Sequence, residues 1–145
     1  MRELVRSAML SESSRVRFIR FVVPDRDDDS GYRQGFIQAA GALDDSGTLS
    51  ATESARFREI LRWFRENLPV PTRFTRTRNA SHKRKRALSW FKGTATLQLA
   101  YAREVVQMLA GHDVVVEMIT TDRPGYIVYE DQYQIVAEPF ADTRT

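Results

Sequence analysis

The pattern of hydrophobic positions begins with a strand. Residues 15–23 are rich in β-branched and aromatic side chains that alternate between two faces. The alternation changes phase around Arg20, because Phe18 lies on one face whereas Ile19 begins a second apolar face. Such a change indicates either a β-bulge or a strand that is covered on both sides. Pro24 is predicted to end the strand, since proline cannot donate to the ladder.

Three helices are predicted next. Apolar residues recur at helical spacing over 32–43, and Ser30 is the expected N-cap of this helix. The second helix has the clearest beginning, because Ser50 and Glu53 have the spacing of a capping box. Its apolar stripe continues until two prolines end it. The third helix is predicted over 87–110 and includes Trp90.

The last part of the chain predicts a β-meander. Residues 114–140 contain three strand-like runs, and a turn with Pro124 and Gly125 joins the first two. We expect the N-terminal strand to join them. The order β-α-α-α-β-β-β predicts an α+β fold, with three helices packed on one face of a mainly antiparallel sheet of about four strands. The expected core residues are Phe18, Phe21, Phe36, Phe57, Ile60, Leu61, Phe64, Leu97, Tyr101, Val105, Met108, Val116, Met118, Ile127, Tyr129 and Ile135.

The composition is close to that of an ordinary soluble globular protein. The 145 residues suffice for one domain over 15–140, after a poorly ordered lead-in or short helix (1–14) and before a tail (141–145). Cysteine is absent, which excludes disulfides and thiolate chemistry and fits a reducing compartment. No apolar run approaches the roughly 20 residues that span a bilayer, and the N-terminus lacks the apolar core of a signal peptide. We therefore expect a cytoplasmic protein that does not contact membranes.

The most distinctive feature is a block of positive charge. Residues 73–92 contain eight cations and no acid, whereas the other 14 of the 22 cations face 19 acids elsewhere. This asymmetry favours a polyanionic partner, because Lys and Arg neutralise phosphates and release counterions. Trp90 and Phe91 lie within the same block and are expected to stack on bases. The predicted polyanion-binding residues are Arg73, Arg76, Arg78, Lys83, Arg84, Lys85, Arg86, Trp90 and Lys92.

An alternative interpretation of this block is structural. Runs of charge are commonly solvated loops, and acids of the same chain, for instance those of residues 25–29, are a second potential partner. If the block does bind another molecule, we expect nucleic acid first and an acidic protein surface second.

Catalytic chemistry has less support. Pairing of the C-terminal strands is expected to bring Glu117, Glu130 and Glu138 onto one face, where they would bind a divalent cation or share a proton. Tyrosines 126, 129 and 133 lie close to them in sequence. The alternative is ordinary cross-strand pairing of these acids with Arg15 and Arg17.

The two histidines do not form a metal site. His82 lies among cations with no carboxylate nearby in sequence, and we expect it in a surface loop. His112 follows the third helix and is expected to cap it. No cofactor-binding motif is present. We therefore expect a small binding or accessory protein without metal or cofactor, rather than an enzyme. The alternatives are an enzyme that uses the carboxylates and tyrosines of the meander, and an oligomerising structural module. A homodimer is a further expectation, from the partly apolar second face of the sheet.

Overall fold

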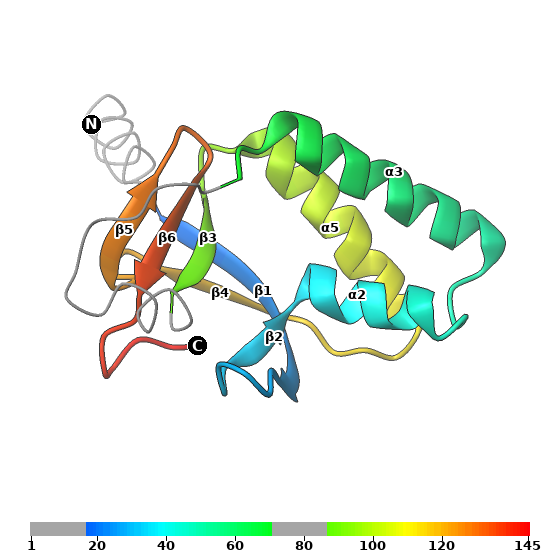
Figure 1. Ribbon diagram of the computed structural model, residues 1–145, viewed down its shortest axis with the longest axis horizontal. Helices are drawn as coiled ribbons and strands as arrows, with labels where there is room; N and C mark the ends of the chain where they lie inside the picture. The colour runs from blue at the N-terminus through cyan, green and yellow to red at the C-terminus, as the bar shows by residue number, and fades with distance from the viewer. Residues whose placement is uncertain (1–16, 71–86) are drawn as a thin grey trace, which may run out of the picture.

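The computed structural model describes residues 17–70 and 87–145, and within them it has the predicted α+β class (Figure 1). Its helices and strands are, in chain order, β1 (Phe18–Arg26), β2 (Arg33–Gly35), α2 (Phe36–Asp45), α3 (Ala51–Asn67), β3 (Leu88–Lys92), α5 (Thr96–Gly111), β4 (Glu117–Thr121), β5 (Tyr126–Glu130) and β6 (Gln134–Glu138). The sheet therefore has six strands where about four were predicted. None of the helices in the described ranges is long and apolar enough to cross a membrane.

The sheet is antiparallel and has β1 near its centre. β4 pairs with one edge of β1, with Arg20 opposite Ile119. The other edge is shared, because β3 pairs with its beginning (Ile19 opposite Phe91) and β2 with its later part (Val22 opposite Gly35). β6 and β5 follow β3 in order. The predicted meander is thus correct for β5 and β6 and wrong for β4, whose partner is a strand far away in the sequence.

The change of phase around Arg20 reflects coverage on both faces of β1. Ile19, Phe21 and Val23 belong to the core between sheet and helices. Phe18 and Val22, on the other face, belong to a second cluster. The remaining buried members of this second cluster are Trp90, Ile119, Ile135 and Ala137.

The prediction that Pro24 ends the first strand is wrong. It lies inside β1, in the irregular stretch between the paired residues Val22 and Arg26. Proline is tolerated at such a position because the ladder is interrupted there in any case.

The helices cover one face of the sheet, and Figure 1 shows α2, α3 and α5 together on that side. On α3 the predicted stripe is confirmed, since Phe57, Ile60 and Phe64 are buried. On α5 the buried residues include Leu99 and Ala102. Three of the expected core residues are instead exposed, namely Leu97 (64%), Met118 (52%) and Ile127 (37%).

Two helix beginnings differ from the prediction. The first helix starts at Phe36 with Gly35 as N-cap, because residues 33–35 pair with β1. Ser30 instead donates through its backbone N–H and its hydroxyl to Asp27 in the preceding loop. The third helix starts only at Thr96, because residues 88–92 form strand β3. These residues hydrogen-bond to β1 and β6, and such non-local pairing overrides a helical pattern.

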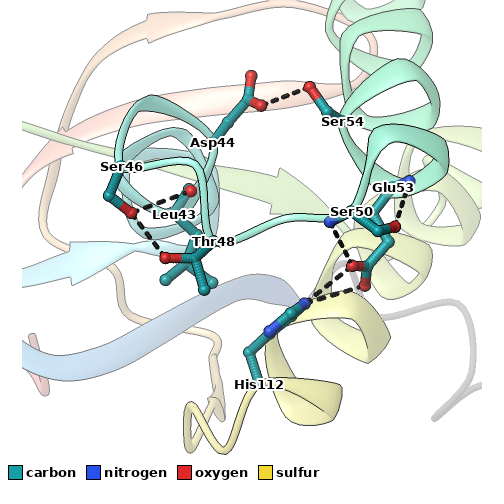
Figure 2. A network of polar contacts seen from close by, with 8 residues as sticks. All are labelled: Leu43, Asp44, Ser46, Thr48, Ser50, Glu53, Ser54 and His112. Atoms are coloured by element: carbon teal, nitrogen blue, oxygen red, sulfur yellow. Dashed lines mark hydrogen bonds and ion pairs between the residues drawn. The ribbon is translucent and has the colours of Figure 1, made fainter.

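The start of α3 is the predicted capping box (Figure 2). The Ser50 hydroxyl accepts from the N–H of Glu53 at 3.1 Å, and the Glu53 carboxylate accepts from the N–H of Ser50 at 2.9 Å. His112, the C-cap of α5, contacts both oxygens of the same carboxylate at 3.0 and 3.1 Å. One glutamate therefore connects the first turn of α3 to the end of α5.

Candidate functional site

Most of the predicted polyanion-binding residues lie outside the described residues. These are Arg73, Arg76, Arg78, Lys83, Arg84, Lys85 and Arg86. His82, which was expected in a surface loop, also lies outside the described residues. The structure does describe both flanks of this stretch. Before it, the buried Gln98 donates to the carbonyl of Asn67 at 3.3 Å, and the buried Gln134 donates to that of Pro69 at 2.5 Å. After it, Leu88 pairs with Ala137 of β6. The two flanks are thus attached to the core.

Trp90 and Lys92 are described, and neither is available to contact a polyanion at the protein surface. Trp90 is only 1% exposed and packs in the second cluster, so its ring is not accessible for stacking on bases in this conformation. The ammonium of Lys92 forms an ion pair with Glu130 at 2.6 Å, and the Lys92 side chain is 15% exposed. Trp90 is in the core because β3 turns one of its faces toward that cluster.

The carboxylates of the C-terminal strands are not brought together as predicted. Glu117 lies on β4, on the opposite side of β1 from the strands of Glu130 and Glu138. It forms an ion pair with Arg33 at 2.5 Å and another with Arg144. These guanidinium groups, Arg33 above all, lower the pKa of Glu117. Within residues 17–70 and 87–145, no group of three or more His, Asp or Glu side chains is placed to hold a metal ion.

The observed partners of Glu117 and Glu130 are Arg33, Arg144 and Lys92 rather than the expected Arg15 and Arg17. Arg15 lies outside the described residues, and Arg17 is exposed at the start of β1. Of the tyrosines, Tyr129 donates to Asp131 at 2.7 Å, which raises the pKa of its hydroxyl. Asp131 in addition accepts from the N–H of Tyr133 at 2.8 Å, so it organises the β5–β6 turn. These contacts give Tyr129 and Asp131 a structural role in the β5–β6 turn.

A cavity that the sequence did not reveal lies where β3 and β2 separate along their shared edge of β1. Its volume is about 330 Å³. Strand β1 contributes Arg20, β3 contributes Trp90, and the beginning of α2 contributes Gly35. The other residues that line it are Ile19, Phe21, Phe36, Ile37, Gln38, Leu68, Ser89, Phe91 and Gln134. Cavities that bind small organic molecules have similar volumes and mostly apolar linings.

Two buried donors in the lining have no hydrogen-bond partner among the described residues. They are Nη1 of Arg20 and Nε1 of Trp90, on side chains that are 8% and 1% exposed. The guanidinium lies over the Trp90 ring at 5.4 Å from its centroid, which is a cation–π contact. An unsatisfied buried donor costs about 1–3 kcal/mol and a charged one more, so this arrangement disfavours the folded state by itself.

The surroundings of Arg20 are electropositive. Burial lowers its pKa to about 10, and the charge of Arg33 acts in the same direction. Arg20 therefore remains charged at neutral pH. No Asp or Glu is among the described residues that line the cavity. In the described part of the chain, the positive charge thus has no acidic counterpart inside the cavity.

The first turn of α2 adds to this positive potential. Its N-cap is Gly35, which has no side chain to cap the helix, and the first turn contains no acidic residue. The first N–H groups of a helix have no partner within it, and the macrodipole places partial positive charge there. Gly35, Phe36, Ile37 and Gln38 all line the cavity.

Sequence reasoning singled out Arg20 only as the point where the alternation of β1 changes phase. One feature of the sequence does point to it, since an arginine between Ile19 and Phe21 is a charge placed inside an apolar run. The opening beside it depends on the separation of β3 and β2. No local pattern encodes that separation.

Comparison with known proteins gives no relative. No protein-family model, no curated protein and no solved structure matches this chain.

Proposed function

We propose that this protein is a small binding or accessory protein that contacts a polyanion through the basic segment 73–92, with nucleic acid as the first candidate and an acidic protein surface as the second. One observation is central: this segment contains eight cations and no acid, while the remainder of the chain is acidic. A dense cluster of cations attracts phosphate-rich molecules and gains free energy from the counterions they release.

Fewer residues are available for these contacts than the whole segment contains. Trp90 is buried and Lys92 is paired, so the proposal rests on the seven cations between Arg73 and Arg86. The hydrogen bonds to Asn67 and Pro69 support it, because they attach the beginning of this stretch to the body of the protein.

The paired state of several acids is a second support. Glu53 is engaged by His112, Glu104 by Arg56 and Glu117 by Arg33, all within the described residues. Acids that already have such partners are less available to neutralise the basic segment. The alternative is that the basic segment pairs with the acids of residues 25–29 of the same chain. A binding experiment must distinguish this pairing from contact with a polyanion.

The test is fluorescence anisotropy of labelled single- and double-stranded oligonucleotides, titrated with the protein at several salt concentrations. If about four cations contact phosphates of a duplex, log K falls with log salt at a slope of about −3.6. Reversing the charges of Lys83, Arg84, Lys85 and Arg86 to glutamate flattens this slope.

The matched control reverses four arginines that are exposed and lie outside the segment, namely Arg17, Arg62, Arg65 and Arg103. It changes the net charge equally and keeps a slope close to that of the wild type. Equal loss in both variants would attribute binding to net charge alone. Absence of binding at low salt to both oligonucleotides and polyglutamate would overturn the proposal.

A homodimer is a second candidate, favoured by strand β4. Among the described strands β4 pairs only with β1, so its other edge has no neighbouring strand there. Val115 and Met118 are 70% and 52% exposed beside this edge. Exposed apolar residues at an open edge favour pairing with a second copy. Sedimentation equilibrium tests this, with Met118→Lys expected to shift a dimer toward monomer, and a concentration-independent monomer mass for the wild type contradicts it.

A further inference from the structure

We propose that the cavity between β1, β3 and the beginning of α2 binds a small organic carboxylate with an apolar body. The described residues that line it include none of the cations of the basic segment, and the proposal does not rest on the proposed function. Four properties of the cavity support the proposal: its donors, its charge, the helix that begins in it and its apolar walls.

The donors define what a ligand must offer. Arginine and the tryptophan indole have only donors, so Nη1 of Arg20 and Nε1 of Trp90 need an acceptor. Within residues 17–70 and 87–145 the protein gives neither of them one. Both residues line the same cavity, and one ligand group would have to contact both atoms. A carboxylate has two acceptor oxygens and matches the planar guanidinium fork.

The charge of the cavity selects an anion. Arg20 is 8% exposed and no carboxylate is among the described lining residues, so within the described part of the chain a neutral ligand would leave the buried charge uncompensated. The uncapped first turn of α2 adds its N–H groups and its partial positive charge. One guanidinium with one helix N-terminus suits a single negative charge better than the double charge of a phosphate monoester.

The other residues that line the cavity favour a ligand whose body is apolar. Ile19, Phe21, Phe36, Leu68 and Phe91 give the cavity mostly apolar walls. With a volume of about 330 Å³ the space is at the lower end of the range for small-molecule sites. A ring or short hydrocarbon chain attached to the carboxylate satisfies both the walls and the volume.

The test is isothermal titration calorimetry of the full chain with phenylacetate, phenylethanol and inorganic phosphate. Phenylethanol replaces the carboxylate with a neutral hydroxymethyl group and keeps the ring. Phenylacetate is expected to bind at least tenfold more tightly than either of the others. Equal affinity for the alcohol would show that charge has no role, and tighter binding of phosphate would overturn the assignment to carboxylates.

Two variants examine the donors. Arg20→Met removes the charge while keeping an apolar chain, and is expected to weaken phenylacetate binding at least tenfold without lowering the melting temperature. Trp90→Phe removes Nε1 and keeps an aromatic ring, and is expected to weaken binding about threefold to tenfold. Arg103→Met is the control, because Arg103 is exposed on α5 and outside the cavity. Undiminished binding by Arg20→Met would contradict the proposal.

A further variant tests whether phenylacetate binding is independent of the basic segment. In it, the charges of Lys83, Arg84, Lys85 and Arg86 are reversed. This variant is expected to bind phenylacetate as the wild type does. A loss of phenylacetate binding in this variant would assign the carboxylate to the basic segment and would overturn the cavity as the site.

Discussion

Asp113 has an unfavourable backbone conformation at the end of α5. Its φ of 60° is in the left-handed region, where a side chain is strained. The N–H of Asp113 binds the carbonyl of Ala110, and that of Val114 binds the carbonyl of Leu109, which is the Schellman arrangement. Gly111 is the last residue of α5 and does not occupy this position. The position that requires glycine is therefore occupied by an aspartate.

We expect Asp113→Gly to raise the free energy of unfolding by about 0.5–1 kcal/mol. The substitution removes the strain of the left-handed conformation and a negative charge next to a helix C-terminus. Urea unfolding curves at neutral pH measure the change. Asp113→Ala is the control, since it removes the charge but keeps the strain, and it is expected to gain less. Equal gains for both variants would refute strain as the cause.

Arg20 is the second residue that disfavours folding. Because folding lowers its pKa to about 10, the charged form has a cost at neutral pH, and the cost disappears as the pH rises above that folded pKa. We expect Arg20→Met to raise the free energy of unfolding by about 1–2 kcal/mol, after loss of the cation–π contact with Trp90. Thermal unfolding at neutral pH measures it. A destabilised Arg20→Met protein would show that the buried charge is compensated.

At the scale of single elements, the beginning of α3 combines a cap with a contact between helices. Ser50→Ala is expected to cost about 1 kcal/mol, because the N–H of Glu53 loses its acceptor. Glu53→Gln keeps an acceptor for the N–H of Ser50 and loses the charge that faces His112. Urea unfolding of both variants separates the cap from the charge.

The pH dependence of these two variants is expected to differ. The backbone N–H of Ser50 and then His112 lower the pKa of Glu53 below its usual 4.5. The stabilising effect of the charged form is therefore present above pH 4.5 and is lost as the pH falls through the lower folded pKa. Ser50→Ala retains part of this acid sensitivity, while Glu53→Gln loses it. Identical pH profiles for Glu53→Gln and the wild type would rule out Glu53 as the titrating group.

The elements that the sequence predicted correctly are those with local determinants. The capping box at Ser50 and the stripe of α3 each depend on residues within a few turns of one another. Strand β3 was missed because its two faces both contain large apolar residues, so Trp90 also matched the helical stripe of the residues after it. Its strand conformation depends on β1 and β6, which lie far away in the sequence.

At the scale of the whole molecule, pairing between distant strands decides what local patterns cannot. β4 follows α5 and precedes β5, yet it pairs with β1 at the start of the chain. This pairing separates Glu117 from Glu130 and Glu138. Long-range pairing also creates the cavity beside Arg20, because β3 and β2 pair with different parts of β1 and separate between them. The charge block, by contrast, is a property of the sequence alone.

Acid unfolding is the last prediction, and it involves carboxylates throughout the described residues. The pKa of Asp27, Asp44, Glu53, Glu117 and Asp131 is lowered in the folded protein, by hydrogen bonds or ion pairs that outweigh the opposing effect of burial. Because each folded pKa is below the ordinary values of 3.8 for Asp and 4.5 for Glu, the unfolded chain binds protons first as the pH falls.

The protein is therefore expected to keep constant stability from neutral pH down to about pH 5, and then to lose it steeply below about pH 4. Urea midpoints measured across this range provide the test. The double variant Asp44→Asn, Glu117→Gln is expected to start from a lower midpoint at neutral pH and to show a shallower acid decline, since two of the five groups no longer titrate. A variant with the same acid slope as the wild type would show that these carboxylates do not govern acid unfolding.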